Sequence, residues 1–171
     1  MAAAPVTADP LDAIMAVMQR AFDPRYGEAW SRRQVADALL LGNCRYALVD
    51  ADGVLGEIQP GAQPAGFFLS RAVLDEEELL LLAVDPAFRR RGLGTLLVKR
   101  FAGAACERGI RRLFLEMRRG NPAAGLYEAH GFHAIGVRPG YYRADDASRI
   151  DALSYERVFD PGGRDDGRLG D

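Results

Sequence analysis

The stretch Glu78–Thr95, ELLLLAVDPAFRRRGLGT, decides the fold that we expect for this chain. Its apolar run Leu79–Val84 has the length and composition of a buried strand. Asp85-Pro86 ends that strand, because proline has no N–H to give to the ladder. A basic turn that contains two glycines follows and leads into a helix. The stretch therefore predicts a strand, a sharp turn and a helix in immediate succession.

The basic turn has the features of an anion-binding loop. Gly92 and Gly94 allow the backbone to approach a ligand closely. The helix that follows directs its free N–H groups and the positive end of its dipole into the loop, and pyrophosphate is the usual anion there. The loop lacks the Gly-Lys-Ser/Thr of a Walker A loop and the Gly-x-Gly-x-x-Gly of a dinucleotide-binding fingerprint. The alternative is a plain helix start, with glycines for tight packing and arginines facing water.

Length and composition indicate one ordinary globular domain. The chain has 171 residues, of which 49% are apolar and 27% are charged, and its net charge of −2 gives no support for nucleic-acid binding. No apolar run approaches the roughly 18 residues of a membrane span, and residues 1–10 lack the pattern of a secretory signal. We therefore expect a cytoplasmic protein with no membrane partner. Cys44 and Cys106 form no metal-binding spacing, so we expect structural thiols and no metal.

The remaining sequence reads as helices and strands of a mixed sheet, an α/β or α+β fold over residues 1–160. Helices are expected at 10–22 with Asp9 as cap, after the capping box Ser31-x-x-Gln34, at 95–108, and at 122–130 with Asn121 as cap. Strands are expected at 46–50, 65–74, 79–84, 110–117, 132–137 and 152–159, with residues 2–8 as a weak edge strand or a frayed end. Loops are expected at 53–64 and at the acidic, solvated turn Asp75–Glu78. Residues 161–171 are too polar to pack and are expected to be a disordered tail.

Two side chains are candidates for acid–base chemistry. Glu116 ends a strand beside the end of the 79–84 strand, where ligands bind in an open sheet, and a carboxylate there can accept a proton from an ammonium. Tyr127 lies on the next helix and can protonate a departing thiolate. From spacing alone, each also fits a structural role, as a surface glutamate and as a core tyrosine. His130 and His133 make a poor metal site.

Three motifs carry a resemblance to a known family. The pattern Arg89-x-x-Gly92-x-Gly94 after Val84-Asp85-Pro86 resembles the acetyl-CoA loop of the GNAT superfamily of N-acetyltransferases. The run LFLEMRRGNPAAGLYEAHGF at Leu113–Phe132 resembles the ribosomal-protein alanine N-acetyltransferases, as does the region with Tyr141-Tyr142 and Asp151-Ala152. The resemblance is close over 79–142 and loose over 9–159. It implies one GNAT-like domain with a mixed, mostly antiparallel sheet of six to seven strands and about four helices.

The resemblance also implies a role for each matching residue. Glu116 matches the general base and Tyr127 the general acid. The residues that match contacts to acetyl-CoA are Leu82, Ala83 and Val84 for the thioester and pantetheine, Arg90, Arg91, Gly92, Leu93, Gly94 and Thr95 for the pyrophosphate, and Asn121.

The implied reaction is direct acetyl transfer to a primary amine, above all the N-terminal α-amine of a protein such as a small-subunit ribosomal protein that begins with Ala. Asp75–Glu78 and Asp145-Asp146 are candidate contacts for a basic peptide. The irregular segment 53–64 leaves the acceptor open. A small-molecule amine or a protein lysine as acceptor, a non-catalytic acyl-CoA-binding module and a nucleotide-binding domain are the alternatives.

Overall fold

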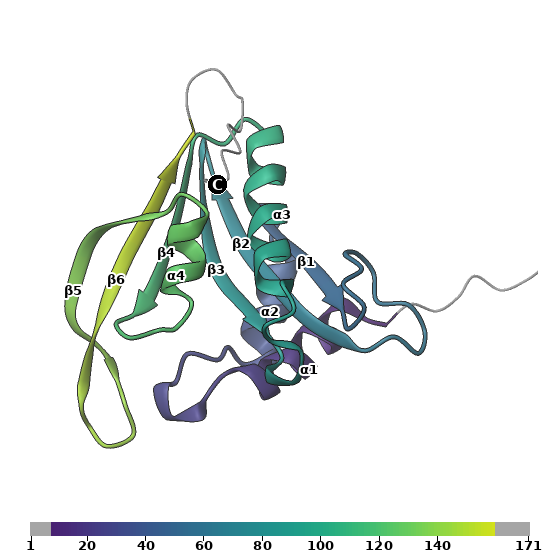
Figure 1. Ribbon diagram of the computed structural model, residues 1–171, viewed down its shortest axis with the longest axis horizontal. Helices are drawn as coiled ribbons and strands as arrows, with labels where there is room; N and C mark the ends of the chain where they lie inside the picture. Colours follow the sequence, from purple (N-terminus) through teal and green to yellow (C-terminus); the bar gives the residue numbers. More distant parts are fainter. Residues whose placement is uncertain (1–7, 160–171) are drawn as a thin grey trace, which may run out of the picture.

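The computed structural model describes residues 8–159, which form one six-stranded sheet with helices on both faces (Figure 1). The strand order is β1-β2-β3-β4-β6-β5. The strands are β1 (Cys44–Asp50), β2 (Pro64–Val73), β3 (Glu76–Val84), β4 (Arg112–Arg118), β5 (His133–Arg143) and β6 (Arg149–Val158). Neighbouring strands are antiparallel except for the parallel pair β3–β4. The expected mixed, mostly antiparallel sheet is confirmed.

The helices form one layer on each face of the sheet. The helices α1 (Pro10–Ala21) and α2 (Arg32–Leu40) pack with β1–β3 into one apolar cluster, and α3 (Leu93–Glu107) and α4 (Ala124–Ala129) pack into the other. Single 3-10 turns, η1 (Pro24–Tyr26) and η2 (Pro86–Phe88), follow α1 and β3. The predicted caps of α1 and α2 are confirmed, because Asp9 accepts from the Leu11 N–H and Ser31 forms a capping box with Gln34.

The strands β3 and β4 separate halfway along their length. Their pairing runs from Glu76–Arg112 to Leu79–Leu115 and stops there. Beyond that point β3 continues to pair with β2, and β4 with β6. Leu80 is an extra residue in β3, because Ser70 pairs with Leu79 and the preceding Leu69 pairs with Leu81. Such a bulge bends its strand, and Figure 1 shows the lower ends of β3 and β4 diverging.

The acidic run before the central strand is not a solvated turn, and that expectation is wrong. Glu76, Glu77 and Glu78 begin β3, and Glu77 is only 1% exposed. Its carboxylate accepts a hydrogen bond of 2.6 Å from Ser70 Oγ and pairs with Arg108 at the end of α3. A buried charge is tolerated when it is paired and hydrogen-bonded in this way.

Two other expectations near the C-terminus need correction. The strand β5 continues through Tyr141 and Tyr142, beyond the end at residue 137 that was expected for this strand, and a register shift between Arg138 and Tyr142 interrupts its alternation. The helix α4 begins two residues later than expected, with Ala123 at its N-cap position. Asn121 caps the preceding turn instead, because its Oδ1 accepts from the Ala123 N–H at 2.9 Å.

Some expectations concern the ends of the chain or the membrane. Residues 2–7 of the edge strand expected at 2–8, and the tail expected at 161–171, lie outside the described residues. Between residues 8 and 159, no helix has both the length and the apolar character needed to cross a membrane. In the same part of the chain, no group of three or more His, Cys, Asp or Glu side chains is arranged to hold a metal ion.

Candidate active site

A pocket of about 590 Å³ opens where β3 and β4 separate. Its walls come from β3, β4, α4 and β5 and from the loop between α1 and α2. Four of the candidate catalytic and cofactor-binding residues line it: Leu82, Glu116, Asn121 and Tyr127. The other candidates, Ala83, Val84 and Arg90–Thr95, are not part of this lining, and Ala83 packs in the cluster on the α1 side of the sheet.

Glu116 is held by two side chains that the sequence did not reveal. Ser154 lies directly opposite it on β6, and the Ser154 Oγ donates to Glu116 Oε2 at 3.5 Å. Arg138 Nη2 on β5 lies 3.3 Å from the same oxygen. The Arg138 guanidinium also lies 4.5 Å from the centroid of the Tyr141 ring. With 24% of its side chain exposed, the carboxylate is oriented by its partners yet accessible from the pocket.

Tyr127 presents a buried phenol to the same pocket. The residue is 6% exposed, and its ring meets the Phe132 ring edge-on with centroids 5.9 Å apart. Burial raises the pKa of the Tyr127 hydroxyl above that of an exposed tyrosine. The phenol therefore stays protonated at neutral pH and is available as a donor.

A second carboxylate in the pocket had no signal in the sequence. Glu28 comes from the loop between η1 and α2, and its Oε2 lies 3.2 Å from Arg118 Nε. Burial raises the pKa of Glu28, while the charge of Arg118 opposes that rise. Burial, followed by the charges of Glu28 and Glu116, raises the pKa of Tyr142 to about 12. The pocket thus combines three carboxylates, those of Glu28, Glu78 and Glu116, with protonated phenols.

The loop before α3 offers backbone donors. Gly92 is the N-cap, with φ +80°, and no side chain caps the helix. Leu96 is the first residue of α3 whose backbone N–H donates a hydrogen bond within the helix, to the carbonyl of the N-cap Gly92 at 3.0 Å. The backbone N–H groups of Leu93–Thr95 donate no hydrogen bond to the backbone or the side chain of any described residue. Such amides at a helix N-terminus form an anion site.

The two glycines of this loop have different structural roles. Gly92 needs its left-handed conformation, and a Cβ there would meet nothing within 4 Å. At Gly94 a Cβ would lie 3.1 Å from Leu126 Cδ2, so this glycine allows α3 to pack closely against α4. Arg89 ties the loop to its surroundings, because it donates to the carbonyls of Val84 and Ala21 at 3.1 Å each.

Comparisons with known proteins agree with one another. Residues 11–132 match the model of the acetyltransferase (GNAT) family. The chain is 38% identical over 98 residues to the ribosomal protein bS18-alanine N-acetyltransferase of Escherichia coli K12. This match covers 57% of this chain and 66% of that relative, which is just under two thirds of the relative's length. Identity to the Salmonella typhimurium protein of the same name is 44% over 79 residues, covering 46% of this chain and 53% of that protein. The crystal structure of the ribosomal-protein-S18-alanine N-acetyltransferase from Escherichia coli matches with a TM-score of 0.71 and 30% identity, covering 91% of this chain and 92% of that one.

Proposed function

Because this chain belongs to the GNAT acetyltransferase family, we propose that it transfers the acetyl group of acetyl-CoA to the N-terminal α-amine of a protein. The observation that carries this proposal is that Glu116 and Tyr127 line one pocket at the point where β3 and β4 separate. The names of the matched relatives support a ribosomal protein that begins with Ala as the acceptor. An acceptor of that kind favours a cytoplasmic location.

Two stretches of backbone are suited to hold acetyl-CoA. The N–H groups of Leu93–Thr95 bind the pyrophosphate, assisted by the exposed cations Arg90 and Arg91. On the side of β4, residues 80–84 of β3 have no strand partner. Apart from the Val84 carbonyl, which accepts from Arg89, their backbone groups are therefore available to pair with the amides of an extended pantetheine arm. Asn121 lines the same pocket and adds a polar contact.

The two catalytic side chains then move protons in opposite directions. Glu116 takes one proton from the acceptor ammonium, and the neutral nitrogen attacks the thioester carbon. As the C–S bond breaks, Tyr127 gives its proton to the sulfur and regains one from the newly acylated nitrogen. An α-amine, with a reference pKa near 8, is a better acceptor at neutral pH than a lysine near 10.4. The carboxylates Glu28 and Glu116 also favour an approaching cation.

Mass spectrometry of a defined acceptor mixture tests the proposal. The mixture contains a peptide that begins with Ala, the same peptide with a blocked N-terminus and an internal lysine, and a polyamine. We expect acetylation of the free N-terminal peptide, and a loss of about 100-fold or more in kcat/KM for Glu116→Gln and about tenfold or more for Tyr127→Phe. Glu57→Gln, at an exposed glutamate, is the control. Acetylation of only the lysine or the polyamine would identify another acceptor, and coenzyme A binding without any transfer would support the non-catalytic alternative.

A further inference from the structure

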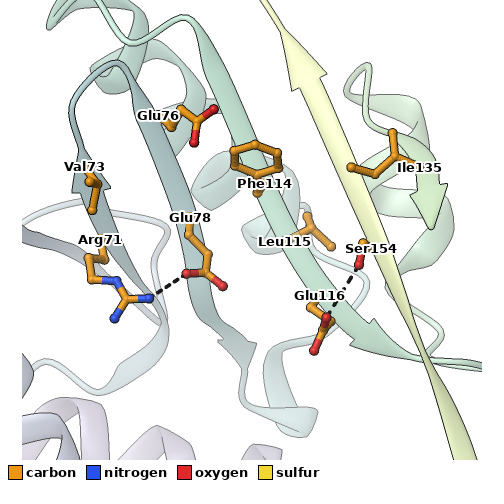
Figure 2. Close-up of a pocket in the computed structure, with 9 residues that line it drawn as sticks. All are labelled: Arg71, Val73, Glu76, Glu78, Phe114, Leu115, Glu116, Ile135 and Ser154. Carbon is orange, nitrogen blue, oxygen red and sulfur yellow. Dashed lines mark hydrogen bonds and ion pairs between the residues drawn. The ribbon is translucent and has the colours of Figure 1, made fainter. Parts of the chain in front are cut away.

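A second hollow lies on the sheet face that carries α1 and α2. These helices pack on β1, β2 and β3. Over the adjacent part of the sheet, a groove of about 360 Å³ extends across β2, β3, β4, β6 and β5 (Figure 2). Phe114 and Leu115 contribute apolar surface to it, and Glu76, Glu78, Glu116 and Arg71 are its charged lining. We call it the open-face groove.

The open-face groove begins at the proposed catalytic base. Glu78, Leu115 and Glu116 line both the groove and the pocket between β3 and β4. Figure 2 shows Glu116 at one end of the groove and Glu76 at the other. We infer that the groove binds the acceptor chain beyond its first residue. This inference rests on the proposed function, because it needs the acceptor amine to be placed at Glu116.

The lining indicates what kind of acceptor segment would bind. Val73 and Ile135 flank the groove and are 57% and 45% exposed, so apolar side chains of the acceptor have surface to cover. Three of the four charged side chains of the lining are acidic, which favours basic acceptor residues. Arg71 pairs with Glu78 at 2.9 Å and Arg112 pairs with Glu76 at 3.4 Å, but all four side chains are more than 40% exposed. Such exposed pairs are weak, so an incoming basic side chain can replace Arg71 or Arg112.

The size of the groove favours a short extended segment over a folded partner. Nine residues line it, whereas a stable protein–protein interface uses about 20–30 residues on each side. Over Arg112–Leu115, β4 is paired with β3 on one side and β6 on the other, so a segment here is recognised through side chains. The five residues from Arg112 to Glu116 span roughly 13 Å, which an extended acceptor covers with about its second to fifth residues.

Kinetics with peptides of defined length and charge test this inference. The acceptors begin with Ala and are two, five or eight residues long, and the five- and eight-residue peptides carry either Arg or Asp at positions three to five. We expect kcat/KM to rise from two to five residues and to stay level beyond, with Arg peptides favoured roughly tenfold over Asp peptides. The double variant Glu76→Gln/Glu78→Gln should reduce this Arg-to-Asp ratio to near one, and Arg71→Gln should increase it. Glu57→Gln is the matched control and should keep the wild-type ratio.

The outcomes separate the inference from the function on which it rests. A kcat/KM that does not change with peptide length or charge would overturn the proposed role of the groove, and so would an Arg-to-Asp ratio that is unchanged in the double variant. Either result would leave the proposal of N-terminal acetylation intact. If no Ala peptide of any length is acetylated but another amine is, the proposed function itself fails.

Discussion

The carboxylate of Glu116 and the guanidinium of Arg138 lie 3.3 Å apart, on strands separated by β6. Arg138 also contacts the Tyr141 ring, so it holds the carboxylate in one orientation beside the pocket. We expect Arg138→Gln to lower kcat roughly tenfold with a smaller effect on the acceptor KM, because Glu116, the proposed base, loses its positioning. Arg138→Lys should restore part of the loss. Steady-state kinetics test this, with Arg33→Gln, at a side chain 92% exposed, as control; an unchanged kcat would contradict it.

The buried carboxylate of Glu77 should make Arg108 important for stability. Glu77 has no exposed side-chain surface, and Arg108 is its cationic partner. Removing that partner in Arg108→Ala leaves a buried charge with only Ser70, so we expect a loss of about 3 kcal/mol in the free energy of unfolding. Urea denaturation measures it against Arg100→Ala, at an exposed position on the same helix. Equal stabilities of the two variants would show that the pair contributes little.

Two glycines, Gly92 at the N-cap of α3 and Gly103 within the helix, should respond oppositely to alanine. Gly92 has φ +80° and open space where a Cβ would lie, so Gly92→Ala introduces backbone strain alone, about 1–2 kcal/mol. Gly103 lies inside the helix, also with open space, so Gly103→Ala should stabilise by about 0.5–1 kcal/mol. Thermal unfolding distinguishes the signs. In addition, Gly92→Ala should weaken coenzyme A binding in calorimetry and Gly103→Ala should not; equal effects would argue against a loop that holds the cofactor.

The buried phenol of Tyr127 should make the protein sensitive to alkali. Burial raises the pKa of its hydroxyl in the folded state. The stabilisation linked to the protonated phenol is therefore complete at pH values below the ordinary pKa of tyrosine, and it is lost as the pH rises above that pKa. Between about pH 8 and about pH 11, wild type should therefore lose more unfolding free energy than Tyr127→Phe. Urea denaturation at the two pH values measures the difference. If both proteins lose the same amount, Tyr127 ionises as readily in the folded state as in the unfolded one.

Local signals in the sequence predicted much of the fold. The caps at Asp9 and Ser31, the strand before Asp85-Pro86 and the helix after Gly92 all depend on neighbouring residues, and all are present. The position of Glu77 could not be predicted locally. An acidic run reads as solvated, and only α3 and β2 bring Arg108 and Ser70 to it.

The sequence likewise predicted some residues of the candidate site and missed others. Glu116 and Tyr127 belong to motifs, and the fold places both on one pocket. Glu28, Arg138 and Ser154 lie 88, 22 and 38 positions from Glu116 along the chain and carry no motif. They reach the site through the loop before α2 and through strand register, which depends on the whole sheet.

A crystal structure with coenzyme A bound tests the central claim most directly. The account predicts the pyrophosphate at the N–H groups of Leu93–Thr95 and the sulfur in the pocket between β3 and β4, within reach of both Glu116 and Tyr127. Coenzyme A bound elsewhere, or a sulfur outside that pocket, would contradict it.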